Sequence, residues 1–146
     1  MNSVPGSQPT TGELETRLSR SSSLGAFLDE HEDSFVSSDF VSLLRKIFEE
    51  KGISKSVLAK KSGMSDVFLH QVFSGKRKPS RNRLLCLCIG MQVSLEDCQE
   101  LLRRNKNATL YARSRADAII EYGILHHLDL FEINDELFKA DEETLF

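Results

Sequence analysis

Residues 53–81 constrain the fold of this chain more than any other stretch, because small and apolar residues recur there at helical spacings around a glycine. Ala59 permits the close approach of two helices, and Gly63 tolerates the positive φ of a tight turn. Leu69 and Val72 stand three residues apart, so they share one face of a helix and can both be buried. The stretch therefore predicts two short helices that pack against each other across a glycine turn.

A cationic loop follows the second helix, which we expect to end at Gly75. Residues 38–91 contain eleven Lys and Arg against four Asp and Glu, whereas residues 1–37 carry two against six and residues 92–146 six against twelve. The net charge of −3 for the whole chain hides this pattern, and a phosphate backbone responds to local charge. A basic middle between acidic flanks favours nucleic acid as a partner. The alternative is a solvated surface on which cations cluster by chance.

Helix signals extend this unit on both sides. Apolar residues repeat at helical spacing over residues 39–51, and Gly52 ends that helix. Four further helices each follow a serine that can cap them: Ser54, Ser65, Ser80 and Ser94. The fourth helix of the five is so apolar that we expect it to be deeply buried. These signals predict a compact all-α unit.

The flanks predict shorter helical extensions. The first dozen residues are rich in Ser, Pro, Gly and Thr and are expected to be disordered. Helices are expected over residues 13–18, 24–30, 114–128 and 133–140, with Leu137 and Phe138 as the apolar anchors of the last. The predicted domains are a disordered start with short helices (1–37), the five-helix unit (38–104) and a C-terminal helical extension (105–146).

The two short helices have the layout of a helix-turn-helix, in which the first helix braces the second so that it can enter a major groove about 12 Å wide. Gln71 and His70 can hydrogen-bond base edges, and Val67 or Phe68 can contact a thymine methyl group. Asp66 is open to two interpretations, a contact to cytosine or a cap of the helix, and Phe68 can equally pack inward. The candidate base-reading residues are Ser65, Asp66, Val67, Phe68, His70 and Gln71.

Cations and helix N-termini around this motif are candidates for phosphate contacts. They are Ser54, Lys55, Ser74, Lys76, Arg77, Lys78, Ser80 and Arg81. Lys60 and Lys61 are the cations most readily explained as surface residues.

At this point the sequence resembles a known family. Residues 38–104 are similar to the XRE-type (lambda-repressor-like) helix-turn-helix domain, a five-helix fold. The resemblance lies in Leu58, Ala59, Gly63, Leu69, Val72, Ser74, Gly75, Pro79, Ser80 and the apolar fourth helix. The layout is closest to bacterial XRE-domain regulators with a short N-terminal helical tag and a C-terminal helical pair, through the stretches SLGAFLDEHEDSF, QVFSGKRKPSRNRLL, SLEDCQELLRRN and LYARSRADAIIEYGI.

The resemblance implies a sequence-specific DNA-binding transcriptional regulator that inserts a recognition helix, residues 65–74, into the major groove. It implies double-stranded DNA as partner and a homodimer, because operator palindromes reflect a protein two-fold. The chain departs from the family pattern at Lys55 and Asp66, where Gln is usual. Lys55 can still reach phosphate, but Asp66 removes a favourable contact.

The flanking helices leave two alternatives open. The apolar positions of residues 111–124 predict either packing onto the fourth or fifth helix or a dimer interface. The acidic C-terminal segment can dock on the chain's own basic surface or present Leu137 and Phe138 to a protein partner. The rival function is accordingly a protein-interaction adaptor that retains the fold and uses Asp66 and Phe68, or the acidic flanks, to bind a protein.

Other classes find little support in the sequence. No Gly-rich phosphate loop or recognisable nucleophile points to an enzyme, and no cofactor is expected. Cys86 and Cys88 point in different directions on a helix, and His126 and His127 lie on different faces, so no metal site is predicted. Three cysteines, an odd number, fit a reducing compartment. With no membrane span or leader signal visible, a cytoplasmic location is expected.

Overall fold

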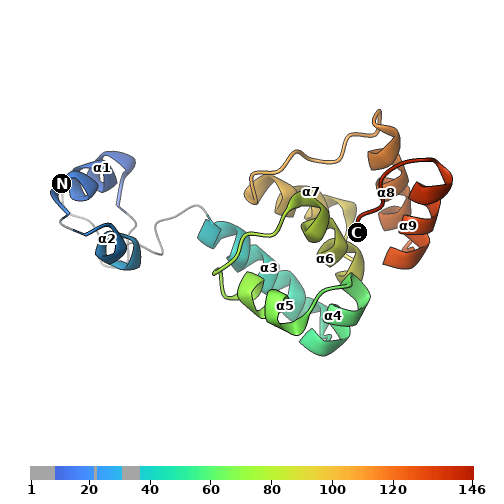
Figure 1. The fold of residues 1–146 in the computed structure, drawn as a ribbon, viewed down its shortest axis with the longest axis horizontal. Helices are drawn as coiled ribbons and strands as arrows, with labels where there is room; N and C mark the ends of the chain where they lie inside the picture. Colours follow the sequence, from blue (N-terminus) through green and yellow to red (C-terminus); the bar gives the residue numbers. More distant parts are fainter. Residues whose placement is uncertain (1–8, 22, 31–36) are drawn as a thin grey trace. The chain divides into compact units, whose positions relative to one another are not determined.

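A computed structural model describes residues 9–21, 23–30 and 37–146, and every regular element in these ranges is a helix (Figure 1). This confirms the predicted all-α class. Contacts within the chain divide it between Ser38 and Asp39 into two compact units. Most of the segment expected to be disordered lies outside the described residues.

The first unit contains two helices that contact each other, α1 (Thr11–Arg20) and α2 (Leu24–Glu30). A capping box starts α1, since the side chain of Thr10 accepts from the Glu13 amide and the Glu13 carboxylate accepts from the Thr10 amide. This box makes α1 longer than the expected 13–18 helix. Ser23 accepts from the Ala26 amide at 3.2 Å, and Phe27 is buried.

Seven helices lie within residues 37–146, of which the first begins two residues before the boundary and the others belong to the second unit. They are α3 (Ser37–Lys51), α4 (Lys55–Ser62), α5 (Asp66–Phe73), α6 (Arg81–Met91), α7 (Leu95–Arg104), α8 (Arg115–Leu125) and α9 (Leu130–Lys139). Helix α6 forms the centre of this unit, because every residue from Leu84 to Met91 is buried. The predicted burial of this helix is confirmed, and α4 packs against it through a close approach at Gly90.

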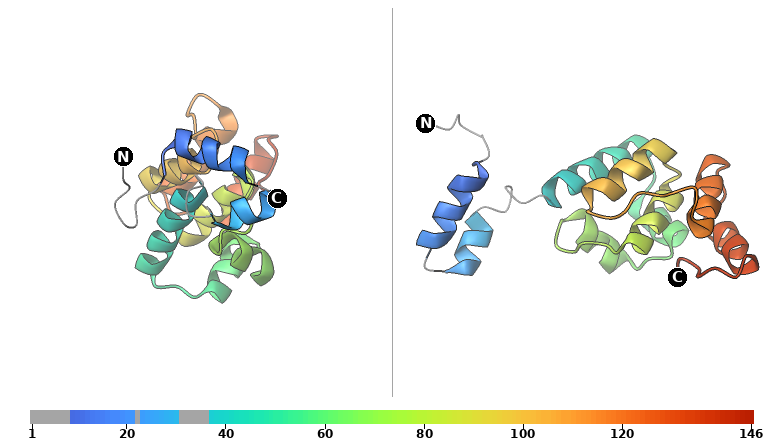
Figure 2. Two further views of the ribbon diagram at one scale, coloured as in Figure 1. Left: turned by 90° about the vertical axis from the view of Figure 1, so that its left-hand side faces the viewer. Right: turned by 90° about the horizontal axis from the view of Figure 1, so that it is seen from above.

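Helices α8 and α9 lie side by side at one end of this unit (Figures 1 and 2). Gly123 permits their contact, because a Cβ built there would lie 2.4 Å from Cγ1 of Ile133. Ile120 and Ile124 of α8 are buried, and α8 also contacts α7, the fifth helix of the predicted unit. Packing within the chain therefore accounts for part of the apolar face expected over residues 111–124. Tyr122 of that face stays 56% exposed.

The bounds of these last two helices differ from those expected. Helix α8 ends at Leu125 rather than at residue 128, since His127 takes a positive φ of 56°. Helix α9 begins three residues earlier than expected, because Asp129 and Glu132 form a capping box. Leu137 is buried, as expected of an apolar anchor, whereas Phe138 is 75% exposed and does not anchor the helix on its own domain.

Candidate nucleic-acid interface

Helices α4 and α5 are held at a fixed angle by a short turn and a shared apolar contact. Gly63 has φ 66° and ψ 28°, and its amide donates back to carbonyl groups of α4. Leu69 and Val72 are fully buried, and Ala59 is 7% exposed. Ser65 then caps α5, with its Oγ accepting from the Phe68 amide at 3.1 Å. The predicted helix-turn-helix skeleton is present, and it fixes which side of α5 faces solvent.

The outward side of α5 holds most of the predicted base-reading residues. Asp66, Val67 and His70 are exposed, and Val67 reaches 68%. Gln71 is half-buried. Because Ser65 supplies the cap, the Asp66 carboxylate remains free of that role, and the capping alternative for Asp66 was wrong. The exposed row runs along one face of α5.

Phe68 differs from the other members of this face. It is half-buried and packs against the core of the domain. Two guanidinium groups also lie over its ring, with Arg77 5.1 Å and Arg83 5.3 Å from its centroid. Such cation–π contacts orient an arginine without neutralising it. Phe68 therefore packs against the core and also holds two cations over its ring. This arrangement matches neither the packing alternative alone nor the base-contact alternative.

The cationic loop after α5 is tied to the end of that helix. The Gln71 carbonyl accepts from the amides of Lys76 at 3.0 Å and Arg77 at 3.2 Å, and from the Ser74 hydroxyl at 3.1 Å. Nη1 of Arg77 also donates to Oε1 of Gln71 at 3.4 Å. Lys76 and Lys78 are exposed and form no ion pair with any residue that the structure describes. The loop therefore carries free charge at a fixed place beside the exposed face of α5.

Further cations lie beside the C-terminal end of α5. Lys55 lies in the first turn of α4, with its Nζ 5.6 Å from the centroid of the Phe73 ring. Nε of Arg45, on α3, donates to the Phe73 carbonyl at 2.7 Å and so caps the end of α5. Arg45, Lys55 and His70 line one hollow of about 300 Å³. Ser54 caps the start of α4, with its Oγ accepting from the Val57 amide at 3.1 Å.

Arg45 and Arg83 were not among the functional residues predicted from the sequence. Both are exposed cations in the basic middle segment. Each lies on the outward side of a helix that was predicted from its apolar positions alone. Nothing in the local sequence indicates that these two residues lie beside the motif. Their contacts with Phe73 and Phe68 depend on how α3 and α6 pack against α5. The excess of charge in residues 38–91 was the available clue.

Arg81 stands apart from the other predicted phosphate ligands. Its Nη2 lies 3.1 Å from Oδ2 of Asp117, and the guanidinium also donates to the carbonyl groups of Ala108 at 2.9 Å and Thr109 at 3.3 Å. These contacts join α6 to the segment before α8. The guanidinium is thus engaged within the chain, and this geometry does not support its prediction as a phosphate ligand. Ser80 caps α6 by accepting from the Arg83 amide at 3.2 Å.

The thiol groups belong to the core rather than to this face. Cys86, Cys88 and Cys98 are all buried and unpaired by disulfides. Burial raises the pKa of the Cys86 thiol from 9.0 to about 11. A hydrogen bond with Cys98, together with burial, raises the pKa of Cys88 well above its ordinary value. Within the described ranges, no group of three His, Cys, Asp or Glu side chains is arranged to hold a metal ion.

Comparison with known protein families identifies the domain that these helices form. Residues 44–98 match the family described as Helix-turn-helix, so this part of the chain is an XRE-like helix-turn-helix domain. The match spans α4 to α6 with parts of α3 and α7, and it defines a DNA-binding regulatory domain rather than an enzyme family. Neither the curated proteins nor the solved structures include a match to the chain. None of the helices in the described ranges is long and apolar enough to cross a membrane.

Proposed function

We propose that this protein is a sequence-specific transcriptional regulator that inserts α5 into the major groove of double-stranded DNA. The observation that carries the proposal is the exposed row of side chains on α5 beside a loop of free cations anchored to the end of the same helix. An α-helix fits the major groove, and cations flanking it neutralise phosphates on both sides. A regulator of this kind would act on DNA in the cytoplasm.

Phosphate contacts are assigned to groups in the loop after α5 and at the start of α4. Lys76, Arg77 and Lys78 follow α5, and Lys55 stands at the start of α4. The hydroxyl groups of the caps and the adjacent amides add neutral donors. The proposed neutral set is Ser54, Ser74 and Ser80. Arg81 is left out because its guanidinium is bonded to Asp117.

Base reading centres on Gln71 and its neighbours. Since the Gln71 Oε1 accepts from Arg77, its Nε2 group is the part left to donate to a base. The Gln71 amide group and the Arg77 guanidinium both present hydrogen-bond donors, and two donors suit the N7 and O6 acceptors of guanine. Val67 supplies an apolar contact for a thymine methyl, Asp66 an acceptor for cytosine N4, and Ser65 and His70 further polar groups at the two ends of the row.

We propose further that two copies bind together to a site with two-fold symmetry. One α5 helix covers only a few base pairs, and pairing two copies doubles the sequence that is read. This expectation concerns stoichiometry alone. The surface that would join the copies is a separate question.

A second candidate function follows from Asp66. Its carboxylate stands exposed in the first turn of α5, where it would approach a negatively charged groove. A protein surface bearing cations would meet the same residue with a favourable charge. The adaptor hypothesis therefore predicts binding that survives neutralisation of Lys76, Arg77 and Lys78 but fails on Asp66→Lys.

Selection of bound duplexes from a random library tests the proposed function. We expect one enriched motif, and we expect Gln71→Ala to relax preference at one position of it. Glu96→Ala is the control, because Glu96 is exposed on α7, outside the helix-turn-helix, and should change nothing. Recovery of random sequence with the intact chain would contradict sequence-specific binding.

A further inference from the structure

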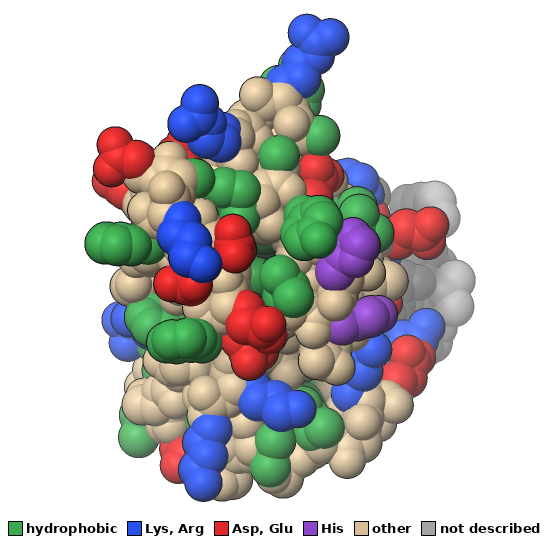
Figure 3. All heavy atoms as spheres, turned by 90° about the vertical axis from the view of Figure 1, so that its right-hand side faces the viewer, with side chains coloured by type: hydrophobic (Ala, Val, Ile, Leu, Met, Phe, Trp, Pro, Cys, Tyr) green, Lys and Arg blue, Asp and Glu red, His purple; other side chains and the backbone are tan. Residues whose placement is uncertain are grey.

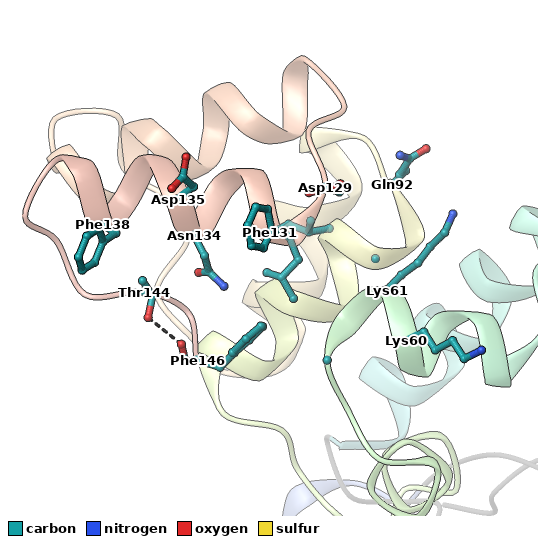
Figure 4. A pocket seen from close by; sticks show the side chains of 14 residues that line it. Lys60, Lys61, Gln92, Asp129, Phe131, Asn134, Asp135, Phe138, Thr144 and Phe146 are labelled. Carbon is teal, nitrogen blue, oxygen red and sulfur yellow. Dashed lines mark hydrogen bonds between the residues drawn. The ribbon is translucent and has the colours of Figure 1, made fainter.

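Charge is distributed differently over two surfaces of the second unit. The face formed by α8 and α9 mixes acidic, basic and apolar side chains (Figure 3). A groove of about 740 Å³ beside α9 is lined by two lysines, Lys60 and Lys61, and by two carboxylates, so charges of both signs surround it (Figure 4). The Phe68 ring on α5 differs, because it holds two guanidinium groups that form no ion pair with any residue the structure describes. The cations that stay unneutralised here lie on the helix proposed to read DNA.

Phe68 and Gln71 stand three residues apart on α5, so they are neighbours on one face of that helix. The Arg77 guanidinium contacts both side chains. It lies 5.1 Å from the centroid of the Phe68 ring, and its Nη1 donates to Oε1 of Gln71 at 3.4 Å. The Arg77 amide also donates to the Gln71 carbonyl at 3.2 Å, which keeps the backbone of the arginine next to its partner. One arginine thus joins an aromatic ring to the amide of a candidate base reader.

The bond from Arg77 fixes which way the Gln71 amide points. A guanidinium has only donors, so the Gln71 atom that faces it must be the oxygen rather than the nitrogen. The Phe68 ring holds the guanidinium at this place, because an arginine is attracted to an aromatic face. Arg83 approaches the same ring from α6, 5.3 Å from its centroid, and repulsion between like charges opposes a shift of Arg77 toward it. Nε2 is therefore the group of Gln71 that is left for a base.

The orientation of the Gln71 amide decides which base it suits. A free glutamine pairs with adenine, since its oxygen accepts from N6 while its nitrogen donates to N7. With its oxygen turned to Arg77, Gln71 meets the base through Nε2, and the adjacent N–H groups of the guanidinium are donors as well. Guanine offers two acceptors, N7 and O6, whereas the N6 amino group of adenine would bring a donor against a donor. The arginine thus favours guanine and disfavours adenine at one position.

We propose that Phe68 is a positioning residue that makes Gln71 specific for guanine, acting through Arg77 rather than by contact with a base. The inference rests on the proposed function, since it concerns one base of the site that α5 would read. It replaces the thymine contact considered for Phe68, because cations lie over that ring. Without the ring, Arg77 is free to leave, and Gln71 regains the pattern that suits adenine.

Binding to two duplexes that differ at one base pair tests this inference. The starting duplex is the one that the intact chain selects, and the varied position is the one at which Gln71→Ala relaxes preference. We expect the intact chain to prefer guanine over adenine there by about tenfold. Phe68→Leu keeps an apolar side chain for the core but removes the aromatic ring, so the preference should move to adenine. Phe68→Tyr keeps the ring and should keep guanine.

Arg77→Ala makes the same test without a change to the core, because Arg77 is exposed in the loop. It should also move the preference to adenine, and it should lower affinity for both duplexes because a positive charge is lost. Lys76→Ala is the matched control. Lys76 is the neighbouring exposed cation, and it donates to the Gln71 carbonyl through a backbone amide that alanine retains. This variant should weaken binding to both duplexes equally and keep the preference for guanine.

The outcomes separate the inference from the function on which it rests. Guanine retained by Arg77→Ala, or adenine preferred by the intact chain, would overturn the positioning role and leave sequence-specific binding intact. An equal loss of affinity for both duplexes in Phe68→Leu would mean that the ring serves packing alone, and it would overturn the role as well. An intact chain that selects no motif would contradict the proposed function and the inference together.

Discussion

The guanidinium of Arg81 and the carboxylate of Asp117 lie against each other, with Nη2 3.1 Å from Oδ2. Arg81 is the first residue of α6, and Asp117 stands in the first turn of α8, so the pair joins the central helix of the domain to the C-terminal helical pair. Oδ2 of Asp117 also accepts from the Tyr111 amide at 2.9 Å. One buried carboxylate thereby holds the α7–α8 connection in place.

Asp117→Ala should lower the free energy of unfolding by about 1.5–3 kcal/mol, because it leaves a half-buried guanidinium and an amide without their acceptor. Chemical denaturation measures the change. Glu100→Ala is the matched control, since its carboxylate pairs with Arg104 at the surface and its loss should cost clearly less than Asp117→Ala. Equal effects of the two substitutions would show that the Asp117 contact contributes little.

The ion pair with Asp117 distinguishes Arg81 from the cations that are free to contact phosphate. Lys76→Ala should lower the log–log salt slope of binding by about 1, because it removes one phosphate contact. Arg81→Ala should leave the slope unchanged, since its guanidinium is already bonded to Asp117. Titrations of both variants against salt give the comparison. A smaller slope for Arg81→Ala would mean that this residue leaves Asp117 to contact phosphate.

Gly63→Ala should destabilise the domain by about 1–2 kcal/mol, because its φ of 66° lies in the left-handed region that a Cβ disfavours. Gly52→Ala is the control, with a φ of 65° and no atom within 4 Å of the added Cβ. The Cβ at Gly63 would instead lie 3.0 Å from Cε1 of Phe146. Gly63→Ala should therefore cost somewhat more than Gly52→Ala by thermal or chemical unfolding. A smaller cost would contradict the contact with Phe146.

The thiols should resist alkylation in the folded protein. Burial raises the pKa of Cys86 to about 11, so the reactive thiolate is scarce near pH 8. The raised pKa also means that the folded state holds this proton more tightly than the unfolded state. Its contribution to stability is complete below pH 9 and is lost as the pH rises through about 11. Mass spectrometry after alkylation checks the first point. Rapid labelling of Cys86 at pH 8 would contradict it.

Local signals in the sequence were enough to predict the helix-turn-helix. The caps Ser54, Ser65 and Ser80, the turn at Gly63 and the apolar α6 act within a few residues of where they stand, so their roles can be read without knowing the fold. The start of α9 was available on the same basis, in the Asp129 and Glu132 capping box, but it was overlooked.

Contacts between distant residues could not be predicted in this way. Arg81 and Asp117 are 36 residues apart, and a cation next to the motif looks like a phosphate ligand until its partner is known. Phe138 follows the buried Leu137 on α9, and periodicity alone could not decide which of the two faces inward. The stacking of Arg77 and Arg83 on Phe68 likewise depends on the packing of α6 beside α5.

The salt dependence of binding to a selected duplex tests the central claim most directly. Lys55, Lys76, Arg77 and Lys78 together predict a log–log slope of about −3.6 for each bound copy, at −0.9 for each neutralised phosphate. Lys76→Ala/Arg77→Ala/Lys78→Ala should bring the slope close to −1 and greatly reduce affinity for the selected motif and for random sequence alike, because phosphate contacts carry no sequence information. Binding that is undetectable at low salt, or a slope near zero, would contradict a DNA-reading role for α5.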